Sequence, residues 1–199
     1  MADGRNSGFI AFFGTKGEAR FMVRTSPFLA RRIRFANDGS LWALGWELSA
    51  DGAERPVYDM LRQYGPDGKL MRSAMPRSIF RAPGSSILQQ SYLAVFGDSA
   101  GVYSHKTNEW IVLSAKTGQI VERWTGLSGE KDMVVRALGV TASGSVFLTC
   151  DSGESRAIHK LDPSSKSWKP VAGMGGRIIG TSGEQLVLRT QGGDIVWAQ

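Results

Sequence analysis

Tyr64-Gly65-Pro66-Asp67-Gly68 is a short polar turn that recurs, in altered form, along the chain. In each copy a large apolar residue ends a strand-like run, the turn follows, and a second strand-like run begins. Successive copies begin at steps of 51, 49 and 48 residues, and they occupy residues 13–17, 64–68, 113–118 and 161–166. A period in this range is typical of stacked β-sheets that repeat along the chain.

A second kind of turn alternates with the first. It is rich in Gly, Asn, Asp and Ser, an apolar run follows it at once, and it occurs at residues 36–40, 140–145 and 180–184. Asp-Gly and Ser-Gly between apolar runs are strong β-hairpin signals. We expect a weaker member at residues 89–91, ahead of the apolar run 92–96. Each repeat therefore holds two hairpins, which make four antiparallel strands.

This pattern predicts an all-β fold, a β-propeller or an arc of one, with three full four-stranded antiparallel blades and a half-blade at each terminus. We predict one domain over residues 1–199. The full blades are expected at residues 26–76, 84–126 and 133–173, and the partial blades at 8–24 and 176–199. In the first full blade the strands are expected at 31–36, 40–48, 57–64 and 69–74.

The terminal pieces leave two arrangements open. They complete one blade together and close a ring of four blades, or the chain is an arc of a larger propeller. The second arrangement is favoured, because the first piece begins without a capping segment. An open arc exposes strand edges and is expected to associate with itself.

Composition excludes several classes of protein. Hydrophobic residues make up 42% and charged residues 21% of the chain, which is usual for a soluble globular protein rather than a disordered one. Cys150 is the single cysteine, which excludes an intrachain disulfide and a paired-cysteine zinc site. We interpret it as a small apolar core residue. The longest apolar runs, of about five residues, are too short to span a bilayer.

The compartment stays open. Residues 1–8 contain no apolar segment of the kind found in secretory signals. A cytoplasmic location follows if Met1 is the native start, and a periplasmic or secreted location follows if the chain is a fragment of a longer protein.

Positive charge is concentrated in the first part of the chain. The net charge is +6, and residues 1–81 hold 13 Lys and Arg against 8 Asp and Glu. The densest group is Arg20, Arg24, Arg31, Arg32 and Arg34, with no acidic residue between positions 18 and 38. It is a patch for phosphate, nucleic acid or an acidic partner, or a set of strand positions that face water. The second interpretation is favoured, because no nucleic-acid motif accompanies the charge.

The turns also resemble those of a known group. Residues 35–43 (FANDGSLWA) and 64–70 are similar to the blade motifs of bacterial six- and seven-bladed propellers, the NHL-like group. Residues 113–118, followed by Trp124, loosely resemble a quinoprotein (PQQ-type) blade. The resemblance implies a propeller that binds proteins, nucleic acids, sugars or lactones. Ser114 replaces the aspartate of the quinoprotein pattern, so no quinone cofactor is predicted.

One motif suggests catalysis. Residues 97–101 read GDSAG, which fits the G-x-S-x-G of hydrolases and resembles the surroundings of a protease serine. Asp151 or Glu154 and then His159 would supply the order of the hydrolase triad. No amphipathic helix follows Gly101, however, and no histidine precedes Ser99 as the protease order requires. We therefore predict a glycine-rich hairpin loop.

The remaining candidates are weaker. His105 is expected at a solvated loop position and His159 on a strand surface. Asp98, Asp151 and Glu154 lie on loops of different blades, where they would hold a cation if they met at one mouth of the ring. The tryptophans, including Trp42, Trp46, Trp124 and Trp168, are expected to pack between blades.

The sequence thus favours a non-catalytic binding or interaction module. No catalytic, cofactor-binding or metal-binding residue is assigned and no cofactor is expected. The partner is an unknown protein or small molecule at the propeller rim, neither a membrane nor, by expectation, a nucleic acid. Self-association through open blade edges is a further expectation. The alternative is a metal-dependent hydrolase of the lactonase type.

Overall fold

The computed structural model describes residues 8–13, 16–80, 90–127, 133–152 and 155–198. The chain divides into two units, which we describe one at a time. The first comprises residues 1–89 and 117–119, and the second comprises residues 90–116 and 120–199.

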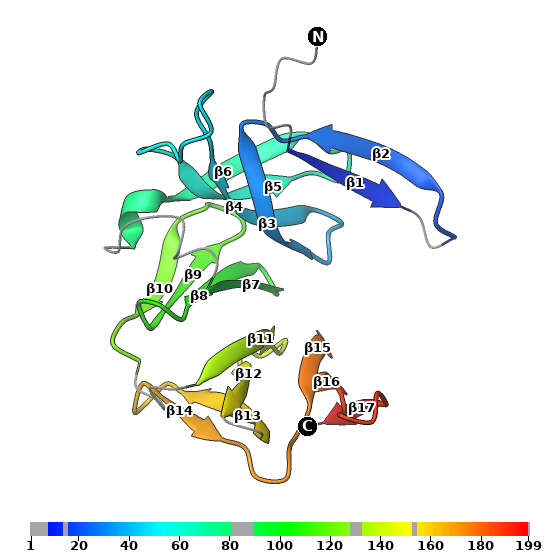
Figure 1. Ribbon diagram of the computed structural model, residues 1–199, viewed down its shortest axis with the longest axis vertical. Helices are drawn as coiled ribbons and strands as arrows, with labels where there is room; N and C mark the ends of the chain where they lie inside the picture. The colour runs from blue at the N-terminus through cyan, green and yellow to red at the C-terminus, as the bar shows by residue number, and fades with distance from the viewer. Residues whose placement is uncertain (1–7, 14–15, 81–89, 128–132, 153–154, 199) are drawn as a thin grey trace. The chain divides into compact units, whose positions relative to one another are not determined.

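The first unit contains two antiparallel sheets (Figure 1). The smaller sheet pairs β1 (Phe9–Phe13) with β2 (Ala19–Arg24). The larger sheet contains four strands, followed by the 3-10 helix η1 (Arg77–Ile79): β3 (Phe28–Phe35), β4 (Leu41–Glu47), β5 (Asp59–Tyr64) and β6 (Leu70–Pro76). No helix in the described part of the chain is long and apolar enough to cross a membrane.

The second unit contains three antiparallel sheets. The first has the strands β7 (Ser91–Phe96), β8 (Ser99–Ser104), β9 (Glu109–Ser114) and β10 (Ile120–Trp124). The next has β11 (Val134–Val140), β12 (Val146–Ser152), β13 (Ser155–Asp162) and β14 (Ser167–Pro170). The last has β15 (Arg177–Ser182), β16 (Gln185–Arg189) and β17 (Ile195–Ala198).

Every sheet is a meander, in which each strand pairs with the next one in the chain. The all-β prediction is confirmed, as are the three full four-stranded sheets with a smaller sheet at each end. The first small sheet has two strands, and the last has three because β17 pairs with β16.

The predicted turns form for the reason that their residues suggest. Gly39 and Gly68 have φ angles of +80° and +78°, which glycine adopts without strain. The preceding aspartates complete the turns, because Oδ1 of Asp38 accepts a hydrogen bond from the Ser40 amide at 2.9 Å and Oδ1 of Asp67 accepts one from the Lys69 amide at 3.0 Å.

The turn predicted at residues 89–91 falls partly on residues 81–89, which lie outside the described residues, and β7 begins at Ser91. The first turn of this sheet is Gly97–Asp98, between β7 and β8.

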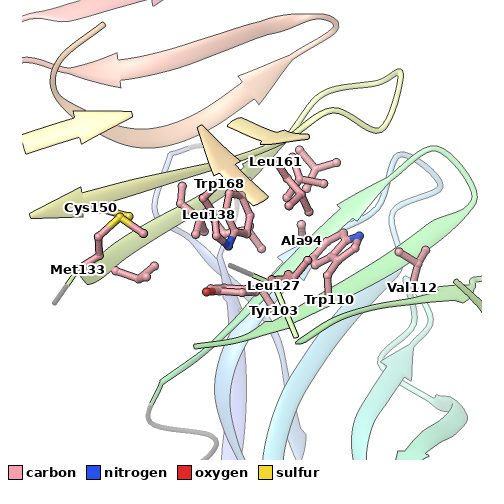
Figure 2. Close-up of a cluster of buried hydrophobic side chains, with 14 residues drawn as sticks. Ala94, Tyr103, Trp110, Val112, Leu127, Met133, Leu138, Cys150, Leu161 and Trp168 are labelled. Atoms are coloured by element: carbon pink, nitrogen blue, oxygen red, sulfur yellow. The ribbon is translucent and has the colours of Figure 1, made fainter. Parts of the chain in front are cut away.

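Within the second unit, successive sheets pack face to face (Figure 2). Side chains from the first two sheets form one apolar cluster, which includes Tyr103, Trp110, Leu148 and Trp168. A second cluster joins the β11–β14 sheet to the last sheet. Both faces of the middle sheet are therefore covered, as in a stack of blades.

The sheets of the second unit are stacked in the same direction. The Tyr92 hydroxyl at the start of β7 donates to the carbonyl of Val135 at the start of β11, at 2.5 Å. At the other end the Ala142 amide donates to the Gly183 carbonyl at 2.9 Å. The first turns of these sheets therefore lie at the same end of the strands, which we call the first-turn edge. The second turns lie at the opposite end of the strands, which we call the second-turn edge.

The first unit has its own core between its two sheets. Ile10 of the smaller sheet is buried against Phe28, Leu41, Ala43 and Tyr64 of the larger sheet. Side chains of β2 alternate between the two faces of its sheet, because Met22 and Arg24 are exposed whereas Phe21 and Val23 are partly buried.

Candidate binding surface

The Gly97–Gly101 motif lies in a β-hairpin, as predicted. Gly97 and Asp98 form the turn, and Ser99 begins β8 opposite Phe96. The Asp98 carbonyl accepts a hydrogen bond from the Ala115 amide at 2.7 Å, which ties the turn to the end of β9. Ser99 is therefore not placed on the strand-to-helix turn that a hydrolase of this pattern uses.

The last glycine of the motif has a packing role. A Cβ atom at Gly101 would overlap the Trp110 ring, and Trp110 is 1% exposed. Gly101 faces Val112 on β9, and Trp110 faces Tyr103 on β8, so the indole crosses the position where a side chain would stand. Gly97 is therefore required by the turn and Gly101 by packing against Trp110, and these two roles account for both glycines of the motif.

The carboxylates that were considered for a cation do not meet. Asp98 lies at the first-turn edge of its sheet, whereas Asp151 lies at the end of β12 that pairs with Val134, at the second-turn edge. Glu154 lies outside the described residues. Among the residues that the structure describes, no group of three His, Cys, Asp or Glu side chains is placed to share a metal ion.

Asp151 is already held by two cations. Its carboxylate accepts hydrogen bonds from Nε of Arg156 at 2.9 Å and from Nε of Arg136 at 2.6 Å. These bonds, first from Arg156 and then from Arg136, hold the pKa of Asp151 below its usual range. The arrangement fixes β11, β12 and β13 at one edge of their sheet.

The prediction of a surface position for His159 is wrong. The side chain is 5% exposed and lies between Leu148 of β12 and Pro170 of β14. Alternation along residues 158–160 predicts a solvent-exposed face only when a single face of the sheet is covered by neighbouring elements. Here both faces are covered, so Ile158 and His159 are both buried.

His105 is in the β8–β9 turn, as predicted, but it is half-buried. Its Nδ1 atom is buried and has no hydrogen-bond partner among the described residues, and burial lowers the pKa of the imidazole. Its ring centroid is 6.4 Å from that of Tyr103, whose hydroxyl donates to Oδ1 of Asn108 at 3.2 Å. The described residues thus give Nδ1 of His105 no carboxylate partner of the kind that orients a general base.

Trp124 and Trp168 pack as predicted where two sheets meet. Trp168 of β14 lies edge-on to Tyr103 of the neighbouring sheet, with ring centroids 5.2 Å apart. Trp42 is fully buried in the first unit, and Cys150 is buried in the same cluster as Trp168, as predicted for an apolar core residue (Figure 2). Trp197 on β17 is different, because it is 58% exposed.

Two ion networks in the first unit were not recognised from the sequence. Glu47 contacts both Arg62 and Arg55, and the Arg62 guanidinium lies 4.3 Å from the centre of the Phe28 ring. Glu54 Oε1 accepts hydrogen bonds from the Tyr58 hydroxyl at 2.7 Å and Arg77 Nε at 2.6 Å. Burial, and then Glu54, raise the pKa of Tyr58. Partners up to 23 residues apart give no local sequence signal.

The arginine group is divided between two strands. Arg24 ends β2, whereas Arg31, Arg32 and Arg34 lie on β3 and form what we call the β3 arginine strip. Arg31 occupies the register shift between Ala30 and Arg32, so the strip is not a simple alternation. Arg31 and Arg34 are exposed. Desolvation by the surrounding residues, and then the nearby charge of Arg32, lower the pKa of Arg34, although part of its side chain reaches solvent.

Comparisons with known proteins find similarity among solved structures. No protein-family model matches the chain. No curated protein matches it either. Among solved structures, the virginiamycin B lyase of Staphylococcus aureus matches with a TM-score of 0.50 at 10% identity, over 96% of this chain. The fold is a β-propeller fold. This chain spans 63% of the length of the lyase, and at this identity the likeness extends to the fold alone.

Proposed function

We propose that this chain is a non-catalytic binding module of a bacterial propeller of the NHL-like kind, and that the β3 arginine strip binds an acidic ligand or partner. The observation that carries the proposal is the presence of three arginines within four positions of one strand, two of them exposed. An anion would relieve the crowding of Arg34 by Arg32. A rigid sheet that presents such a strip is suited to binding without chemistry.

Heparin, a sulfated polyanion, is a suitable probe for this strip. We expect the full chain to be retained on a heparin column and to elute at a salt concentration above that of a neutral protein, since screening by salt weakens such binding. Replacement of Arg31, Arg32 and Arg34 by Ser should lower the elution salt markedly. The matched control replaces three exposed cations of the second unit, Lys166, Arg177 and Arg189, by Ser.

The control makes the test decisive. It removes the same charge as the strip variant, so an equal loss of retention in both variants would show that net charge alone governs binding. Unchanged retention of the strip variant would contradict the proposal directly. Circular dichroism of both variants checks that they remain folded.

The metal-dependent lactonase alternative has less support. It requires clustered carboxylates, yet Asp98 and Asp151 lie at opposite edges and Asp151 binds two arginines. We expect no rise in melting temperature with millimolar calcium or zinc, whereas a specific ion would stabilise the folded chain by mass action. The solved neighbour is named as a lyase of virginiamycin B, and a likeness at 10% identity does not carry that activity to this chain.

A further inference from the structure

The first and last sheets of the chain each bury only one face. In the β1–β2 sheet, Ile10 packs onto the β3–β6 sheet, whereas Phe9 and Met22 on the other face are 62% and 64% exposed. Arg24 lies opposite Phe9, and Ala11 lies opposite Met22. We call this surface, formed by Phe9, Ala11, Met22 and Arg24, the leading face.

The last sheet has the converse arrangement. Leu186 and Leu188 pack onto the β11–β14 sheet, whereas Ile195 and Trp197 are 52% and 58% exposed. Val187 pairs with Trp197, and a Cβ atom at Gly180 would meet nothing within 4 Å. We call the surface formed by Val187, Ile195 and Trp197 the trailing face.

These faces correspond to surfaces that are covered elsewhere in the chain. In the middle sheet of the second unit, Leu148 is buried against the sheet before it and Phe147 against the sheet after it. A leading face is thus what a preceding sheet covers, and a trailing face is what a following sheet covers. Large apolar side chains exposed together on a sheet mark an interaction site.

We infer that the trailing face of one copy of this chain binds the leading face of a second copy, so that the stack of sheets continues from one molecule into the next. A second copy supplies a sheet of the required chemistry, with an apolar face presented in the same stacking direction. The solved neighbour of the same fold is longer than this chain, with 37% of its length outside the matched part. Such a contact is heterologous, with different surfaces on the two partners.

Sedimentation velocity on the full chain tests this inference. We expect the mean mass to rise with concentration, and Met22→Glu or Trp197→Glu alone to weaken association about tenfold or more, because a buried charge in the centre of an interface is strongly unfavourable. An equimolar mixture of the two variants should associate again, since each supplies the face that the other lacks. Val57→Glu, at a position that is 85% exposed outside both faces, is the matched control.

Three outcomes would overturn the inference. One is a monomer at all concentrations. Another is a Met22→Glu variant that associates as the parent does. The last is a mixture of the two variants that stays monomeric, which would show that the intact trailing face of one variant does not bind the intact leading face of the other. If Met22→Glu does not fold, Phe9→Glu places the charge on the same face. Heparin retention tests the β3 arginine strip separately, so failure of either proposal leaves the other standing.

Discussion

At the level of single residues, the contact between Gly101 and Trp110 explains why position 101 is a glycine, although the motif around it resembles that of a hydrolase. We expect Gly101→Ala to lower the free energy of unfolding by about 1–3 kcal/mol, because the added methyl group overlaps a fully packed indole. Urea denaturation measures this change. Gly180→Ala is the control and should change stability by less than about 0.5 kcal/mol, since the space around Gly180 is open.

Replacement of Trp110 by a smaller side chain tests whether overlap with the indole causes the loss of stability in Gly101→Ala. In a double-mutant cycle, Trp110→Leu should cost less in the Gly101→Ala background than in the parent chain, because it removes the overlap. Strictly additive losses would show that the Gly101 effect arises from the backbone instead.

Asp151 links stability to pH. Arg156 and Arg136 lower its pKa in the folded chain, so its contribution is fully present above the ordinary aspartate pKa of about 3.9 and is lost as the pH falls through the lower folded value. We expect Asp151→Asn to cost about 1 kcal/mol at pH 7, because the site is partly exposed. The difference from the parent chain should shrink toward pH 2 in urea unfolding.

The neighbouring hairpin provides the comparison for Asp151. Asp98, exposed at the Gly97–Asp98 turn, is changed to Asn in the control, which should cost much less at pH 7. A constant difference between the Asp151 variant and the parent from pH 7 to pH 2 would contradict the ion-pair explanation.

At the level of elements, the strands of one sheet differ in how far they are buried. The fourth strand β10 and the edge strand β17 are largely exposed, whereas β8 and β9 are almost entirely buried. We expect the amides of β10 and β17 to exchange with deuterium before those of β8 and β9, because exposed edge strands open locally at low free energy. Mass spectrometry of peptides from each strand measures the order. Uniform protection across the β7–β10 sheet would contradict this expectation.

The hairpins show what a sequence can and cannot predict about elements. Asp38–Gly39 and Asp67–Gly68 were located correctly, because a turn is set by the conformations of its own residues. Gly97–Asp98 was recognised as a hairpin loop but not as the first turn of its sheet. His159 was misplaced, because its burial depends on a neighbouring sheet that no local pattern reveals.

The candidate binding surface likewise combines features set by local sequence with features set by strand pairing. The arginine group and its division between two strands were visible in the sequence, but the register shift at Arg31 is set by strand pairing. The ion pairs of Glu47 and Glu54 were missed for that reason. Asp98 and Asp151 seemed able to meet only until the order of turns placed them at opposite edges.

At the level of the whole molecule, the division into two units predicts how the chain unfolds. Sheets that contact only their neighbours form separate cooperative units, so damage to one unit should not spread fully to the other. Ile10→Ala removes a buried side chain of the first unit and Leu188→Ala one of the second, and each should cost about 2–5 kcal/mol locally.

Hydrogen exchange in low urea distinguishes local from global loss. Ile10→Ala should accelerate exchange in β1, β3 and β4 while leaving β12 and β13 close to the parent rates, and Leu188→Ala should do the reverse. The two variants serve as controls for each other, because both truncate a buried aliphatic side chain to alanine. If either variant accelerates all of these strands equally, the chain unfolds as a single cooperative unit, and the contact boundary between the two units has no energetic counterpart.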